Sequence, residues 1–151
     1  MFLKVQGVTG EASDPTHKGE INIVSWSWGM DSPREAITGL AKGRVVVSEL
    51  NIVKRVDQSS ATLMSFLRNN KVVPLAQLTV RKAGDEPFEY FKIEMENVKV
   101  TSLKAESDDD ELVEHLSLGF SKVRVTYTPQ GKTGGSGGGA NVFETDAHTG
   151  A

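Results

Sequence analysis

The sequence predicts a mainly β protein, an antiparallel β-barrel or sandwich with one flanking α-helix. Three observations favour this fold class. Apolar and polar residues alternate with period two over most of the chain, one stretch alone has helical spacing, and turn-forming residues divide the remainder into about six or seven short strands. A chain of 151 residues fits one domain and is long enough to bury a core.

The N-terminal part is predicted to form two strands. Residues 2–8 open the chain as a short strand, and a polar stretch with the turn-forming pair Asp14-Pro15 follows. Residues 21–28 then alternate in period two, which predicts the second strand.

The two faces of the 21–28 strand differ in character. One face carries Val24, Trp26 and Trp28, and because large indoles favour an interior we expect Trp26 and Trp28 to be core residues. The small polar side chains then lie on the opposite side of the sheet. That opposite face carries Ile21, Ile23, Ser25 and Ser27.

A long loop and a further strand are predicted next. The loop runs from Gly29 to Gly43, and a loop of about 15 residues within a domain usually has a function or is disordered. Residues 44–53 are rich in β-branched side chains, which favours a strand.

One helix is predicted, beginning between Asp57 and Ser60. Leu63, Phe66 and Leu67 have the i, i+3, i+4 spacing of a helix that packs on one side. Asn69-Asn70 ends it, and Pro74 prevents its continuation.

The C-terminal half is predicted to hold three strands. Residues 75–82 and 88–100 form a hairpin, and the acidic segment 106–111 is interpreted as a solvated loop. Residues 112–128 form the last long strand. Its apolar positions change phase at Ser121-Lys122, which is typical of a β-bulge or of a strand that changes sheets.

The tail has a different composition. Residues 131–151 are rich in glycine and are predicted to form a flexible tail, following a β-barrel domain at 1–130. Within the tail, residues 141–144 either add a short edge strand or form no regular structure.

Composition and charge exclude several classes of protein. The absence of cysteine excludes disulfides, thiol nucleophiles and cysteine-ligated metal sites. A net charge of −3 with scattered basic residues argues against nucleic-acid binding. No apolar stretch is long enough for membrane insertion, and the N-terminus lacks the pattern of a cleavable signal peptide. We therefore expect synthesis in the cytoplasm.

No catalytic, metal or cofactor site is predicted. His17, His115 and His148 lack the spacing of a metal site, and the acidic run at 106–111 lacks the alternating ligands of a calcium loop. The glycine motifs of the tail lack the strand and helix context that phosphate loops and nucleophile elbows need. We therefore expect that the protein is not an enzyme.

Several short segments occur in a characteristic order along the chain. They are Gly10-Glu11 with Ser13, Thr16-His17, SWSWGM (25–30), KRVD (54–57), LTVRKAG (78–84), EY (89–90), LSLGF (116–120) and YTPQ (127–130). This ordered set resembles the haemolysin-coregulated protein (Hcp) family, which forms the tube of type VI secretion systems. The resemblance covers about residues 2–130, and the tail segment NVFE (141–144) has Phe143 where relatives often have tryptophan. The Gly39–Gly43 loop is also less rich in glycine than in some relatives.

The resemblance implies a structural role in secretion. Hcp proteins are small β-barrels that form homo-hexameric rings, and the rings stack into a hollow tube inside a contractile sheath beneath a spike protein. Contraction delivers the tube and its effector cargo out of the donor cell, so the protein would be secreted without a cleavable signal peptide.

Two groups of residues are candidates for contacts in such a tube. Ser25 and Ser27, opposite the tryptophans, are candidates to face the lumen and its cargo. The long loop is the candidate for ring stacking, because rings stack where complementary faces and protruding loops meet along the axis. Its candidate polar contacts are Asp31, Ser32, Arg34 and Glu35.

Two alternative functions remain open at this stage. A tail-tube protein of a phage or another contractile injector would share the ring architecture without the secretion role. A small-ligand-binding β-barrel would need an enclosed apolar cavity, whereas aromatic side chains are expected to fill this interior.

Overall fold

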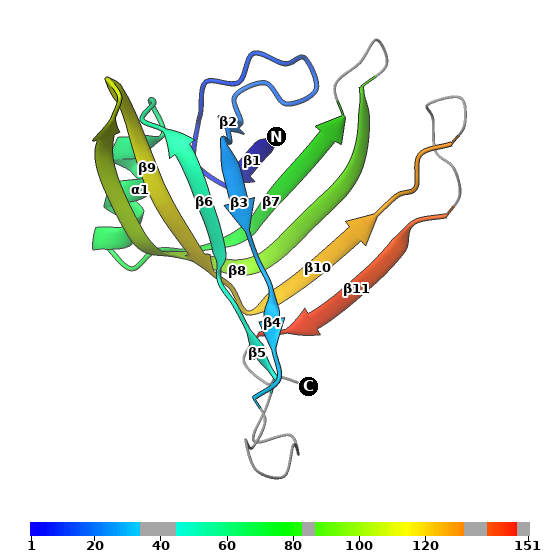
Figure 1. Ribbon diagram of the computed structural model, residues 1–151. Coiled ribbons are helices and arrows are strands. Elements are labelled where there is room, and N and C mark those ends of the chain that lie inside the picture. Colours follow the sequence, from blue (N-terminus) through cyan, green and yellow to red (C-terminus); the bar gives the residue numbers. More distant parts are fainter. Residues whose placement is uncertain (34–44, 83–86, 132–138, 148–151) are drawn as a thin grey trace.

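The computed structural model describes residues 1–33, 45–82, 87–131 and 139–147, and it confirms a mainly antiparallel β fold with a single helix in these residues (Figure 1). The elements are β1 (Phe2–Val5), β2 (Ile21–Asn22), β3 (Ser25–Ser27), β4 (Met30–Asp31), β5 (Val46–Val47), β6 (Leu50–Arg55), α1 (Ser60–Arg68), β7 (Val72–Lys82), β8 (Phe88–Asp108), β9 (Glu111–Gly119), β10 (Lys122–Tyr127) and β11 (Asn141–Asp146).

The segment 21–27 closes the sheet into a barrel. The strand order is β2-β1-β7-β8-β9-β6-β3, so the first and last strands of the path are neighbours in sequence. Between them, the Ile23 amide donates to the Met1 carbonyl and the Val24 amide donates to the Val53 carbonyl. The segment therefore pairs with β1 at its start and with β6 at its end.

The prediction of one regular strand at 21–28 is wrong. Pairing passes from β1 to β6 after Asn22, and the alternation of faces changes phase there. Ile21 and Ile23, expected on the face of the serines, are buried in the core, while Val24 is 43% exposed.

Strand β8 is the central strand of the sheet, because three other strands pair with it. Along one side it pairs with β7. Along the other side its first half pairs with β10 and its second half with β9 (Figure 1). The predicted single strand at 112–128 is thus two strands, which meet β8 one after the other. The phase change at Ser121-Lys122 marks the start of the second.

The acidic segment 106–111 is not the predicted loop. The β8–β9 ladder continues through it to the pair Asp108–Glu111. Only Asp109 and Asp110 form the turn, with φ of 44° and 68°. Two residues of positive φ make the compact turn that suits the twist of a hairpin, and aspartate tolerates that backbone region.

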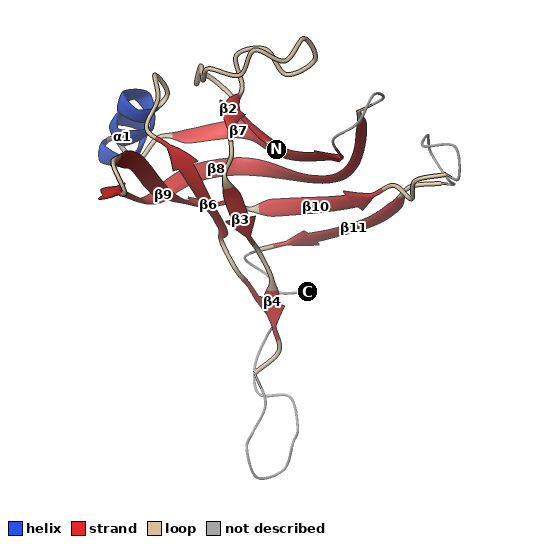
Figure 2. Cartoon of the chain, turned by 45° about the horizontal axis from the view of Figure 1, so that its top comes forward, coloured by secondary structure: helices blue, strands red, loops and turns tan. Residues whose placement is uncertain are grey.

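Helix α1 confirms the predicted apolar stripe. Leu63 is fully buried, and Phe66 and Leu67 are half-buried against the core. The helix packs on β8 (Figure 2). It ends as predicted at Asn69-Asn70, where Asn70 takes the left-handed conformation (φ 52°) that often terminates helices.

Two further features extend beyond the barrel. Strands β4 and β5 pair only with each other and form a ribbon at one end of the molecule, so the predicted loop 29–43 begins as a strand (Figures 1 and 2). Strand β11 pairs with β10 at the edge of the sheet. Of the two alternatives stated for residues 141–144, the short edge strand is therefore the one that forms.

Gly10 packs against backbone where no side chain fits. A Cβ atom there would lie 2.4 Å from the Glu20 carbonyl oxygen and 2.8 Å from Ile21 Cα. We expect Gly10→Ala to lower the free energy of unfolding by about 2–4 kcal/mol in denaturant titrations, because backbone must move. Gly29→Ala, where a Cβ meets nothing within 4 Å, is the control. An equal effect of the two variants would contradict the explanation.

Candidate functional surfaces

A polar face lies across three neighbouring strands. Ser25 and Ser27 are exposed on β3, and the register sets Ser27 beside Asn51 of β6 and Asn51 beside Ser117 of β9. The Ser117 hydroxyl donates to Asn51 Oδ1 over 2.8 Å. With Val53 and His115 these residues line a shallow hollow of about 310 Å³, here called the serine face.

One ionisable pair borders the serine face. His115 is 49% exposed, and its Nε2 lies 2.8 Å from Glu106 Oε1. This contact holds the pKa of Glu106 below its ordinary value, with a smaller contribution from Lys104. The centre of the face therefore carries small neutral groups, and its charges lie at the margin.

The predicted core tryptophans lie at the margin of the core. Trp26 and Trp28 are half-buried and pack against the main cluster. Trp26 stacks on Phe91, with 5.4 Å between ring centroids. Trp28 Nε1 is buried without a hydrogen-bond partner among the described residues. The indoles thus separate the serine face from the barrel interior.

The β4–β5 ribbon carries two of the four predicted stacking residues. Asp31 and Ser32 are exposed at its outer part, whereas Arg34 and Glu35 lie outside the described residues. The ribbon also exposes apolar side chains, since Met30 and Val46 are 45% and 56% exposed. A two-stranded ribbon of this kind has little stability alone, so it suits a contact with another surface.

A third surface was not anticipated from the sequence. On one face of the β10–β11 pair, Phe143 lies opposite Val125, and Tyr127 follows two residues after Val125. Phe143 and Tyr127 are 44% and 46% exposed. We call these three residues the apolar shelf. It lies beside the outer side of β11, with which no described strand pairs.

His17 occupies a buried position between two carboxylates. Its Nδ1 lies 2.8 Å from Glu20 Oε2 and its Nε2 lies 2.7 Å from Glu89 Oε1. Its ring stacks on Phe2. No role for this histidine was predicted from the sequence, although it belongs to the Thr16-His17 motif of the family resemblance.

An ion pair reinforces this cluster. Arg81 Nη2 donates to Asp14 Oδ2 over 2.6 Å, and this hydrogen bond holds the pKa of Asp14 below its ordinary value. The guanidinium also lies 5.0 Å from the centre of the Phe2 ring. The polar loop that carries Asp14 is therefore tied to β7 as well as to β8.

A second buried cluster joins α1 to the barrel. Lys54 of β6 and Glu114 of β9 are fully buried neighbours, and Lys54 Nζ donates to Glu114 Oε1 over 2.5 Å. Lys54 Nζ also contacts Ser60 and Asp57 at the start of the helix. Lysine and glutamate side chains are ordinarily exposed, so the burial of this pair was not predictable from the sequence.

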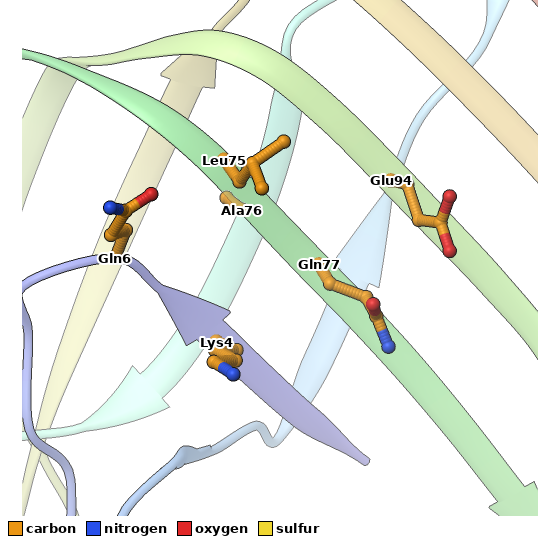
Figure 3. A pocket seen from close by; sticks show the side chains of 6 residues that line it. All are labelled: Lys4, Gln6, Leu75, Ala76, Gln77 and Glu94. Atoms are coloured by element: carbon orange, nitrogen blue, oxygen red, sulfur yellow. The ribbon is translucent and has the colours of Figure 1, made fainter.

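The hollows that the described residues line are open and lie on the outside of the sheet. Figure 3 shows one of about 430 Å³ between β1, β7 and β8. The barrel interior is filled by the core cluster instead. The enclosed apolar cavity of a ligand-binding barrel is thus not seen in the described part. The hollow in Figure 3 is lined by Lys4, Gln6, Leu75, Ala76, Gln77 and Glu94.

The described residues hold neither a metal-ion site nor a membrane-spanning helix. They contain no group of three or more histidine, aspartate or glutamate side chains placed to hold a metal ion. The helix they contain is too short to cross a membrane.

Comparisons with known proteins agree with one another. Residues 2–127 match the family model described as type VI secretion system effector, Hcp. Protein hcp1 of Pseudomonas aeruginosa is 38% identical over 144 residues, which cover 92% of this chain and 89% of that protein.

Solved structures share the fold. Hcp1 from Salmonella typhimurium is 29% identical with a TM-score of 0.78, and the match covers 97% of this chain and 93% of that one. A structure described as a type six secretion system protein has a TM-score of 0.89 at 22% identity, covering 99% and 96% of the two chains, which supports the fold.

Proposed function

This chain belongs to the Hcp family of type VI secretion systems, and we propose that it forms hexameric rings that stack into the tube of such a system. The observation that supports ring formation most directly is the combination of the apolar shelf and the unpaired side of β11. Exposed apolar residues beside an open strand edge suit contact with a different surface of a second copy. Such head-to-tail contacts close into a ring when the rotation between copies allows it.

We propose that the β4–β5 ribbon joins one ring to the next. It projects from one end of the barrel, and the polar loop that carries His17 lies at the other end (Figures 1 and 2). Asp31 and Ser32 supply polar contacts at the ribbon, and Arg34 and Glu35 are proposed to continue them. Exposed Met30 and Val46 supply apolar area.

The serine face is proposed to line the channel of the tube. Its neutral hydroxyl and amide groups suit a lumen through which effector cargo must pass without tight binding. The tube would lie within a contractile sheath and beneath a spike protein, and would leave the cytoplasm of the donor cell without a cleavable signal peptide. In this role the protein moves other molecules and catalyses no reaction.

The ring is tested by light scattering combined with negative-stain microscopy of the purified protein. We expect open rings of about six times the 16.3 kDa chain mass. A compact monomer over a wide concentration range would contradict the assembly. Export of effectors by cells that carry the protein then distinguishes a secretion tube from the tail tube of another injector.

Cargo contact at the serine face is tested with arginine substitutions. We expect the double variant Ser25→Arg, Ser27→Arg to form rings of normal mass while effector export falls by about tenfold, because bulky cations would narrow and charge the channel. Ser65→Arg, an exposed serine on α1, is the control. Normal export by the double variant would contradict a role of this face in the lumen.

A further inference from the structure

His17 lies in the loop between β1 and β2, at the end of the barrel opposite the β4–β5 ribbon (Figure 1). The loop forms a small hairpin of its own. Ala12 and Gly19 are paired within it, since the Gly19 amide donates to the Ala12 carbonyl over 2.9 Å and the Ala12 amide donates to the Glu20 carbonyl over 2.9 Å. His17, 5% exposed, lies inside this hairpin.

The contacts of the imidazole ring specify its protonation state. Both ring nitrogens lie within 2.8 Å of a carboxylate oxygen, Nδ1 beside Glu20 and Nε2 beside Glu89. An ionised carboxylate accepts hydrogen bonds and donates none, and a neutral imidazole has a single N–H group. Only the imidazolium, with two N–H groups, satisfies both contacts at once.

The two contacts have different structural roles. Glu20 belongs to the same loop as His17, whereas Glu89 belongs to β8. The Nε2 contact therefore fastens the loop to the sheet, and the Nδ1 contact fixes the ring within the loop. Hydrogen bonds of this kind, between two charged groups, are stronger than neutral ones.

The surrounding charges are few and are paired among themselves. From the loop, Asp14 pairs with Arg81 of β7 at 2.6 Å. Arg81 also faces the amino group of Met1 and contributes to the lowering of its pKa, after burial as the main cause. Phe2 of β1 contributes an uncharged ring, stacked on His17 with 4.5 Å between centroids. Glu20 and Glu89 are thus the charged groups in direct contact with the imidazole.

We propose that His17 is a proton-dependent latch, which holds the 10–20 hairpin on β8 when the imidazole is protonated and releases it when the proton is lost. Because both contacts together need the two N–H groups of the imidazolium, closure is favoured at lower pH and lost as the pH rises. Release would uncover Phe2, which is buried and stacks on His17 in the closed state. The inference concerns this chain alone and holds whether or not rings form.

Hydrogen exchange of the full chain tests the latch at pH about 6 and about 8.5, each rate being corrected for the intrinsic effect of pH. We expect the protection factors of the Ala12 and Gly19 amides to fall by about tenfold or more between these values, which is the loss that one charged hydrogen bond supports. Amides of the β1–β7 ladder should keep their protection. Unchanged protection of the loop in the wild-type chain would overturn the proposal.

Variants show whether His17 is the group responsible. His17→Gln should give low loop protection at both pH values, because its neutral amide does not titrate. His115→Gln is the matched control, since that histidine also contacts a glutamate but is exposed and lies on another face. If His17→Gln does not fold, Glu89→Gln should lower the protection factors of the loop amides at pH about 6. It should also reduce the decrease of these factors between pH about 6 and about 8.5. If the loop protection factors of either variant decreased with pH as much as those of the wild type, the proposal would be overturned.

Discussion

Replacing Lys54 by methionine is expected to lower the free energy of unfolding by about 3–5 kcal/mol. Lys54 and Glu114 are both fully buried, and the ammonium is the donor that compensates the carboxylate. Methionine fills similar space but leaves the glutamate charged and without its cation. The Ser60 hydroxyl donates to the same Oε1 over 2.5 Å but carries no charge, and the second oxygen of Glu114 lacks a hydrogen-bond partner among the described residues, so the carboxylate regains no cation.

Removal of both charges should recover most of the loss. A buried ion pair often contributes little relative to well-packed apolar residues. The free energy of unfolding of the double variant Lys54→Met, Glu114→Leu is therefore expected to lie within about 1 kcal/mol of the wild-type value. Arg55→Met is the control: its exposed pair with Glu111, 3.6 Å apart, should contribute less than about 0.5 kcal/mol. Wild-type stability of the single Lys54→Met variant in urea titrations would contradict the expectation.

The second large effect is expected at the apolar shelf. Phe143→Asp should convert the proposed rings to monomers at micromolar concentration, because a charge replaces an aromatic side chain at the centre of each contact. Truncation of an aromatic interface residue commonly weakens an interface by about 2 kcal/mol or more, and every interface of a ring carries the change. Light scattering gives the mass, and circular dichroism shows whether the β fold is retained.

Met64→Asp provides the matched control. Met64 on α1 is 44% exposed, as Phe143 is, but it lies on the helix and away from β11. Its replacement by aspartate should leave the ring mass unchanged. Intact rings with Phe143→Asp, or dissociation by both variants alike, would exclude the shelf as the specific ring contact.

Local sequence patterns predicted the elements whose apolar residues all face one way. Helix α1 has one stripe, and Phe91, Ile93 and Met95 of β8 share one face, so the pattern and the structure agree at these positions. The 21–28 segment carries apolar residues at both odd and even positions. Such a pattern fits a strand that changes partner midway, but a single continuous strand is the simpler interpretation. That interpretation set Ile21 and Ile23 on the wrong face.

The remaining differences depend on contacts between distant residues. Lys54 is buried because Glu114, far along the chain, lies beside it in the sheet. Likewise His17 meets Glu89 only after β1, β7 and β8 have assembled. The acidic 106–111 segment forms strand because the ladder of β8 and β9 extends through it, although its composition alone is typical of a loop. No local pattern specifies these partners.

Strand β8 also has a mechanical consequence. It has 21 residues, of which 88–99 pair with β7 on one side, while on the other side 91–96 pair with β10 and 99–108 pair with β9. A force applied along the strand would load these ladder bonds together, in shear, rather than opening them one by one as in peeling. Displacement of β8 therefore requires many hydrogen bonds to break at once, which suits the proposed role in a tube driven by a contracting sheath.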